Sequence, residues 1–593
     1  MRELRADDPN GVRLMEAVRI PGAGVRVTGE GMERKQKKGH NIVTVLLQDY
    51  FHRAVFKQAI GEKQWTRFES RLDRNVDQTC ELLDRYGIKA TFFTLGWIGD
   101  NYPDVVRRIA AEGHEVASAG YWARSVDEIG PQRFEEDLAR ARTSLERAAG
   151  RRVVGYRCAY RNVAARQLWV LDVLAKHGYA YDASVRERLW KPGRNGPTRV
   201  ASQWETSFEA IREFPVSTVS LLGFNVPIGG GNYLRQFPHS LMFRAFQRWI
   251  RTQSEPFVLY FHPWELDPEQ PMVSAVGALG RMRQYRNLGK MKRILPAYFE
   301  SAPFTSAADY LGVDAGMAPE RGTTRTEESA VHLTSGPAGP VRFVSLVIPF
   351  HNEEASLPYL KRSLDELIEN GRRIYEFEIV LVDDASTDGT SSALRRIFKD
   401  RQDVRIVALP QNRGVAGAIL SGIRNASHQV ECSMDADCSY DPVEALKMIP
   451  RLKDDVSMVT ASPYHPEGGV LGVPAWRLVL SKSLSGLYRL VLTHKLHTYT
   501  SCFRVYRRDD ALAAANTYGD FRGIVELLAR MDSQGKRVVE YPTTLQSRIF
   551  GHSKMKTLRT IFLHAALLWR VMRSRRSERE FGSAHQRAQK TPS

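Results

Sequence analysis

Two carboxylates one residue apart, Asp435 and Asp437, directly follow an apolar run that ends at Met434. Carboxylate oxygens in this spacing suit a hard divalent ion that also bridges a diphosphate. We therefore predict a site for a divalent ion, whose charge would stabilise a departing nucleoside diphosphate. The same spacing also occurs in solvated turns, so its meaning depends on the elements around it.

Those elements alternate between short apolar strands and amphipathic helices. We expect strands at residues 343–348, 378–382, 404–409 and 429–434, and helices at 357–370, 390–399 and 416–425. This alternation indicates βαβ units and a parallel sheet, whose carboxyl edge gathers ligand-binding residues. At that edge we expect, in chain order, Pro349, Glu353, Asp383, Asp384, Asn412 with Gly414, Asp435 and Asp437.

This ordered set of motifs resembles glycosyltransferase family 2, over residues 341–573. The resemblance implies a GT-A (Rossmann-like) fold and an inverting, metal-dependent transferase. It also implies nucleotide-sugar binding by Pro349, Glu353, Asp383, Asp384 and Asp435, with Asp435 and Asp437 as catalytic residues and as the ligands of Mg²⁺ or Mn²⁺.

Within that family, the chain is most similar to the polyprenyl- and dolichol-phosphate sugar synthases. The residues that carry this similarity, and that it implies bind the acceptor or its phosphate, are Arg477, Ser481, Arg504, Arg548, Ser553 and Lys554. Ser439, Ala461-Ser462-Pro463 and Cys502 depart from the expected Gln, Gly-Ser-Arg and Gly, so the acceptor stays open between a polyprenyl phosphate and a lipid-linked glycan. A glycan hydroxyl would need a general base, for which Glu526 is the candidate.

The first half also alternates strands with helices, with strands expected at 42–47, 89–95 and 114–118 and helices at 71–86 and 104–112. It resembles the polysaccharide deacetylase family, in a branch associated with exopolysaccharide loci. The motifs that carry the resemblance are residues 49–52, 89–93, 113–118, 155–157, 181–182, 214–215, 227–231 and 261–268. The resemblance implies a distorted (β/α) barrel.

The chemistry of that family is missing at three positions. The two expected histidine ligands are Ala119 and Ala123, and the expected base is Leu46. Alanine cannot bind a metal, and a zinc hydrolase needs about three protein ligands. Although Asp49, His114, Arg157 and His262 are retained, we expect no zinc and an inactive, pseudoenzyme domain.

The composition divides the chain into segments. We expect a flexible arm at 1–40, the deacetylase-like domain at 41–311, a linker at 312–341, the glycosyltransferase domain at 342–556, a membrane-surface helix at 557–573 and a basic disordered tail at 574–593. No apolar run approaches the roughly 18 residues of a membrane span. Residues 478–492 and 561–571 are apolar on one face with Lys and Arg at intervals, which suits the headgroup layer of a membrane.

The net charge of the protein indicates which kinds of partner it binds. Lys and Arg outnumber Asp and Glu by 85 to 67, for a net charge of +18, which suits phosphate-bearing substrates and anionic lipid. No nucleic-acid motif is present. The sequence thus predicts a cytoplasmic glycosyltransferase, peripheral on the inner face of the plasma membrane, that moves a hexose in exopolysaccharide synthesis beside polysaccharide-assembly proteins. A bifunctional deacetylase–transferase and a non-catalytic scaffold are the alternatives.

Overall fold

The computed structural model describes residues 26–28, 40–160, 167–184, 202–221, 224–314, 316–318, 342–515, 517–551, 563–564 and 566–573. The chain forms two compact units. The first is built from the described residues of Met1–Ala54, Ser70–Gln270 and Leu279–Thr324, and the second from those of Val55–Glu69, Pro271–Ala278 and Arg325–Ser593.

The first unit is built on a mixed sheet, with ten strands among the described residues. Its order is β1 (Arg26–Thr28), β7 (Ser202–Glu205), β8 (Ile211–Glu213), β6 (Tyr181–Asp182), β5 (Gly155–Tyr156), β4 (Glu115–Ser118), β3 (Thr91–Thr94), β2 (Asn41–Leu47) and β11 (Val258–Phe261), with β12 (Phe304–Thr305) also on β2. The strands from β8 to β11 run parallel, whereas β7 is antiparallel to both of its neighbours, β8 and β1. β2 is buried along its whole length, as expected for a strand covered on both faces.

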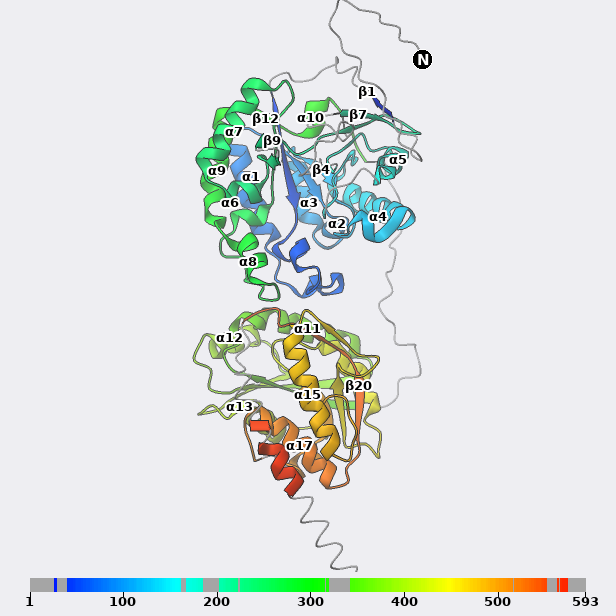
Figure 1. Ribbon diagram of the computed structural model, residues 1–593, viewed down its shortest axis with the longest axis vertical. Helices are drawn as coiled ribbons and strands as arrows, with labels where there is room; N and C mark the ends of the chain where they lie inside the picture. The colour runs from blue at the N-terminus through cyan, green and yellow to red at the C-terminus, as the bar shows by residue number, and fades with distance from the viewer. Residues whose placement is uncertain are drawn as a thin grey trace, which may run out of the picture. The chain divides into compact units, whose positions relative to one another are not determined.

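Helices line both sides of this sheet in Figure 1, with α6, α7 and α9 on one side and α2, α4 and α5 on the other. The helices are α1 (Leu72–Arg85), α2 (Gly96–Asn101), α3 (Pro103–Ala111), α4 (Val126–Ala149), α5 (Trp169–Lys176), α6 (Gly231–Gln236), α7 (His239–Thr252), α8 (Ala278–Tyr285), α9 (Met291–Ser301) and α10 (Ala307–Leu311). β9 (Thr218–Leu221) and β10 (Phe224–Pro227) form a separate hairpin. The strands and helices predicted between residues 42 and 118 are confirmed within about two residues.

The second unit contains a sheet with seven strands among the described residues. Its order is β15 (Val404–Ala408), β14 (Tyr375–Asp383), β13 (Arg342–Phe350), β16 (Val430–Ser433), β19 (Arg504–Arg507), β17 (Met458–Ser462) and β20 (Val538–Pro542). β15, β14, β13 and β16 are parallel, which confirms the predicted βαβ core. β19 is antiparallel to both of its neighbours, so the expectation of a wholly parallel sheet is wrong at this side.

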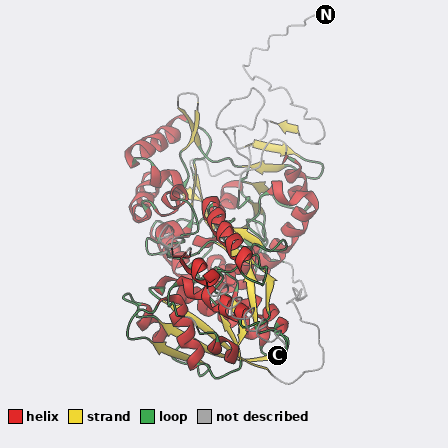
Figure 2. Cartoon of the chain, turned by 60° about the horizontal axis from the view of Figure 1, so that its bottom comes forward, coloured by secondary structure: helices red, strands yellow, loops and turns green. Residues whose placement is uncertain are grey.

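Helices pack against this sheet as well, among them two that contact β13 or β14; Figure 2 colours the helices of the whole chain red and its strands yellow. The helices of this unit are α11 (Leu357–Gly371), α12 (Thr390–Ile397), α13 (Gly414–Asn425), α14 (Ala445–Met448), α15 (Ala475–Val491), α16 (Arg508–Ala513) and α17 (Phe521–Ser533), and residues 566–573 are also helical. β18 (Gly469–Leu471) and β21 (Thr544–Gln546) form a small parallel pair. In the part of the chain that the structure describes, no helix is long and apolar enough to cross a membrane.

Candidate functional site

The carboxyl edge of the second sheet brings together the carboxylates that the sequence singles out. Phe350, near the end of β13, is in register with Asp383 at the end of β14, and Val347 with Ser433 at the end of β16. Pro349 lies in β13, while Glu353, Asp384, Asp435 and Asp437 follow these three strand ends. The edge therefore gathers six predicted site residues from three separate segments of the chain.

The backbone is strained directly after each of these three strands. Asn352, Ala385 and Cys438 adopt positive φ angles of 56°, 53° and 52°. Residues other than glycine rarely take this conformation, and such outliers cluster at functional sites. Asn352 Oδ1 accepts hydrogen bonds from Thr387 N and Asp388 N, so the first two loops hold each other in place.

Asp384 shapes the loop before α13. Its two oxygens accept hydrogen bonds from Arg413 N (2.6 Å) and Gly414 N (2.8 Å). Burial raises the pKa of Asp384, and the two backbone N–H groups oppose that rise. Gly414 has φ of +75°, and a Cβ there would lie 2.8 Å from the Gly519 oxygen. Asp384 thus orders the glycine-containing loop at the edge of the site.

The Asp-x-Asp pair lies just beyond β16. Asp437 Oδ1 accepts a hydrogen bond from Ser439 N at 2.9 Å. Burial, and then the charge of Asp437, raise the pKa of Asp435 to about 7. Cys502 is close enough to Asp435 to be affected in turn, since burial followed by that carboxylate raises the thiol pKa well above its usual value. Ser439 and Cys502 therefore lie beside the Asp-x-Asp pair, although the sequence marked them only as departures from the expected pattern.

A guanidinium group lies between two of the acidic side chains. Arg548 Nε donates to Asp437 Oδ2 at 2.8 Å, and its Nη1 donates to Glu353 Oε1 at 2.9 Å. The carboxylates thus already attract a cation. Two carboxylates at a strand end, one of them pairing with a positive charge, fit a divalent ion held by Asp435 and Asp437.

Two residues predicted to act on the acceptor are instead engaged in the interior. Arg504 is 2% exposed, and its guanidinium donates to the carbonyl oxygens of Ile524 (2.6 Å) and Tyr499 (2.8 Å). Glu526 Oε2 accepts from Thr517 N and Tyr518 N, and its Oε1 pairs with Arg530 at 2.8 Å. Both side chains hold neighbouring loops, which does not fit a phosphate contact for Arg504 or a free base for Glu526.

The remaining acceptor candidates are on α15 or beyond the described residues. Arg477 and Ser481 lie on α15, where the Arg477 guanidinium is 5.2 Å from the Trp476 ring centre. Ser553 and Lys554 lie outside the described residues.

In the first unit, the residues retained from the deacetylase pattern bind other protein groups. Asp49 accepts hydrogen bonds from Tyr50 N, Ser70 Oγ and Arg71 N, and burial raises its pKa to about 6. His262 Nδ1 lies 3.1 Å from Leu46 O, and its Nε2 lies 3.0 Å from Arg53 Nη1. Leu46, Ala119 and Ala123 are buried.

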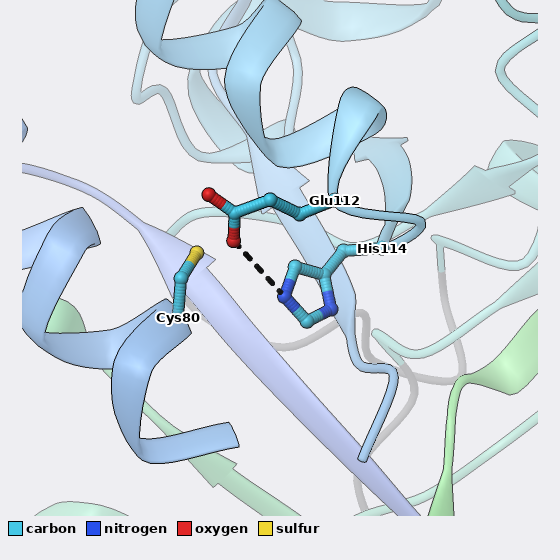
Figure 3. Close-up of side chains that lie close together, drawn as sticks. All are labelled: Cys80, Glu112 and His114. Atoms are coloured by element: carbon cyan, nitrogen blue, oxygen red, sulfur yellow. Dashed lines mark ion pairs between the residues drawn. The ribbon is translucent and has the colours of Figure 1, made fainter. Parts of the chain in front are cut away.

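A different trio, Cys80, Glu112 and His114, lies close together (Figure 3). Within the described residues it is the one group of three or more His, Cys, Asp and Glu side chains near enough to share an ion. His114 Nδ1 accepts a hydrogen bond from Ala90 N, so the neutral ring carries its proton on Nε2, which faces Glu112 at 3.9 Å. A metal would need the lone pair of that nitrogen, so the arrangement does not fit an ion.

Comparison with known families gives three matches along the chain. Residues 345–512 match "Glycosyl transferase family 2", residues 63–181 match "Polysaccharide deacetylase", and residues 191–312 match a domain of unknown function, DUF3473.

Curated relatives match the C-terminal half. The chain is 30% identical over 221 residues to an undecaprenyl-phosphate mannosyltransferase of Micrococcus luteus, covering 36% of this chain and 87% of that protein. It is 29% identical to a polyprenol monophosphomannose synthase of Mycolicibacterium smegmatis (36% of this chain, 82% of that protein). It is 28% identical to a dolichol-phosphate mannosyltransferase of Pyrococcus furiosus (39% of this chain), of whose length the match spans 64%.

Solved structures give weaker similarities. A polysaccharide deacetylase of Mycobacterium smegmatis aligns with a TM-score of 0.33 and 16% identity, over 49% of this chain and 96% of that one. A glucosyl-3-phosphoglycerate synthase of Mycobacterium tuberculosis, in complex with Mn²⁺ and UDP, aligns with a TM-score of 0.31 and 15% identity, over 40% of this chain and 80% of that one.

Proposed function

Because the chain belongs to glycosyltransferase family 2 and also carries a polysaccharide deacetylase domain, we propose that it transfers a hexose from a nucleotide sugar to a polyprenyl phosphate, in cell-surface polysaccharide synthesis. The observation that carries the proposal is the acidic edge formed by Glu353, Asp435 and Asp437 around Arg548. Mannose is the first sugar to test, because the three curated relatives are named for mannose transfer.

The residues at this edge would have different roles in binding the nucleotide sugar. Asp435 and Asp437 would hold Mg²⁺ or Mn²⁺, which when bound supplies charge for the leaving diphosphate. Pro349, Glu353, Asp383 and Asp384 would bind the base and ribose of the nucleotide sugar. The Arg548 guanidinium would bind a phosphate oxygen, the pairing that its fork geometry favours.

The state of Glu526 favours a phosphate acceptor over a glycan hydroxyl. A hydroxyl needs a base to remove its proton, whereas a polyprenyl phosphate is already an anion. Glu526 makes three hydrogen bonds with Thr517, Tyr518 and Arg530, so it is held away from such a role. An acceptor that needs no base fits this arrangement.

A lipid acceptor also fits the surface of α15. Its exposed side is apolar, with Trp476 53%, Val479 63% and Leu490 79% exposed. In residues 566–573, Trp569 is 61% exposed, next to Arg570 and Arg573. Apolar side chains interleaved with cations suit a membrane with anionic headgroups, so we propose peripheral attachment, on the inner face of the plasma membrane.

The deacetylase-like domain would act without deacetylation. Ala119 and Ala123 offer no metal ligand, and Asp49 and His262 bind other protein groups. No observation on the described residues favours the bifunctional alternative.

The test is release of nucleoside diphosphate from UDP-, GDP- and dTDP-sugars, with Mg²⁺ or Mn²⁺, and with or without a short polyprenyl phosphate. Asp437→Asn is the informative variant, and Asp400→Asn, at an exposed position, is the matched control. We expect release that requires both metal and lipid phosphate and is lost only in Asp437→Asn. Release that ignores the lipid would point to another acceptor, and no release from any donor would favour the scaffold.

A further inference from the structure

Arg157 lies at the carboxyl edge of the first sheet, just after β5, and is 7% exposed. Its guanidinium carbon is 4.3 Å from the centre of the Tyr260 ring and 5.9 Å from that of Phe93. With the described residues, this guanidinium makes no hydrogen bond and no ion pair. A buried guanidinium with five N–H donors and no acceptor is costly, so the position calls for an acceptor.

Two more donors near the end of β2 lack acceptors among the described residues. They are Gln48 Nε2 and Arg53 Nε, both buried. The Arg53 guanidinium lies 4.9 Å from the Trp264 ring centre and donates through Nη1 to His262 Nε2. β2, β5 and β11 run parallel in one sheet, so these donors and His262 lie at the same edge.

Three guanidinium groups act on His262 through their charge, and the Glu265 carboxylate acts on Arg53 in the same way. The charges of Arg53, Arg157 and Arg235 all lower the pKa of His262, after burial. Of the three arginines, Arg235 is matched by a carboxylate, Glu265, at 2.9 Å. Neither of the other two forms an ion pair with a described residue.

The nearest acidic groups do not neutralise Arg157 by contact. Asp182, in β6, accepts a hydrogen bond from Ser184 Oγ at 2.6 Å, and burial raises its pKa. Glu213, in β8, acts on Arg157 through its charge without pairing with it. At the end of β2, Leu46 is apolar and supplies no carboxylate.

We propose that this edge of the deacetylase-like unit binds an oxyanion carried by a saccharide, such as the carboxylate of a uronic acid, through Arg157, Arg53 and Gln48. A guanidinium pairs with a carboxylate through two parallel hydrogen bonds, which would satisfy donors that have no acceptor among the described residues. The saccharide part of the proposal rests on the match of residues 63–181 to a family named for polysaccharides. The anionic part rests on the hydrogen-bond donors of these three side chains. The site stands apart from the transferase proposal and does not rest on it.

The experiment measures binding of a galacturonic acid trisaccharide to the full-length protein by isothermal titration calorimetry. A neutral galactose trisaccharide and inorganic phosphate are the comparison ligands. Arg157→Gln and Arg53→Gln are the test variants, and Arg244→Gln, at an exposed position on α7, is the matched control. We expect the uronic trisaccharide to bind, with an affinity about 10-fold or more lower in each test variant and unchanged in the control.

Thermal unfolding of each variant without ligand shows whether a loss of binding comes from a loss of stability. Arg157→Gln should unfold at the wild-type temperature or higher, because it removes a buried charge that forms no ion pair with a described residue. Equal binding of charged and neutral trisaccharides, or none, would overturn the proposal. So would a lower unfolding temperature in Arg157→Gln with unchanged binding, which would make Arg157 structural.

Stronger binding of free phosphate than of the trisaccharide would refute the proposal that the ligand is a saccharide. Nucleoside diphosphate release should be unaffected, so failure of this site is distinct from failure of the transferase.

Discussion

Replacing Arg548 with glutamine should strengthen the binding of a divalent ion to the nucleotide-free protein. In the structure, Arg548 Nε holds Asp437 Oδ2 at 2.8 Å, and Nη1 holds Glu353 Oε1 at 2.9 Å. An ion that takes Asp437 as a ligand must displace the first of these bonds. Arg548 therefore competes with the metal for Asp437 until its guanidinium binds a phosphate.

The size of the effect follows from the bond that is lost. A hydrogen bond to a charged group contributes about 1.5–3 kcal/mol. The Arg548 side chain is 25% exposed, so solvent screening places the contribution near the lower end of that range. About 1.5–2 kcal/mol corresponds to roughly a 10- to 30-fold gain in metal affinity. Turnover should nevertheless fall, because the variant loses its proposed phosphate contact.

Mn²⁺ binding can be followed by the electron paramagnetic resonance signal of the free ion, without substrate. Arg405→Gln is the matched control, since Arg405 pairs with Glu378 at 3.4 Å at an exposed position in β15. Unchanged or weaker Mn²⁺ binding in Arg548→Gln would refute the competition. Tighter binding in the control as well would assign the gain to net charge alone.

Three further predictions concern other parts of the second unit. Glu431, buried in β16, has a pKa raised to about 8 from 4.5 by burial. Because the folded state holds its proton more tightly, stability should fall between about pH 4.5 and 8, by up to a few kcal/mol, and Glu431→Gln should abolish this fall in denaturant unfolding at pH 5.5 and 9. Glu526→Gln should lower the free energy of unfolding by about 1–2 kcal/mol and reduce turnover with a lipid phosphate less than 10-fold. A 1,000-fold loss of turnover at unchanged stability would instead make Glu526 the base. Leu490→Glu should weaken sedimentation with anionic vesicles about 10-fold, whereas Leu279→Glu, also exposed, should not, and equal effects would contradict the membrane face of α15.

The sequence predicted the parts of the site that local patterns define. Apolar runs ending in polar residues located β13, β14 and β16, and hence the edge on which Asp384 and Asp437 lie. The antiparallel direction of β19 was not predictable in this way, because a strand's direction depends on the sheet it joins and not on its own residues.

Side-chain partners distant in the chain were beyond the reach of sequence patterns. Arg548 meets Asp437 across 111 positions. Arg504 matches a motif that predicts a phosphate contact. In the structure its guanidinium instead donates to the carbonyl oxygens of Tyr499 and Ile524 and so links two loops. A motif fixes the residue type, whereas burial and backbone partners decide whether its charge can reach a ligand.

The two sheet edges illustrate how residue replacement redirects the chemistry of a site. In the second unit, Glu353 and Asp437 share the single guanidinium of Arg548, so the edge attracts a cation. In the first unit, Leu46 supplies no carboxylate and Ala119 and Ala123 supply no imidazole, and Arg157 forms no ion pair with a described residue, although Asp182 and Glu213 act on it through their charge. We propose that such an edge, even without metal ligands, binds an anion, because a buried arginine and donors without acceptors among the described residues favour one. On this reasoning, restoring a carboxylate by Leu46→Asp should abolish binding of the uronic trisaccharide without restoring deacetylation, since both alanines would still lack ligands for a metal.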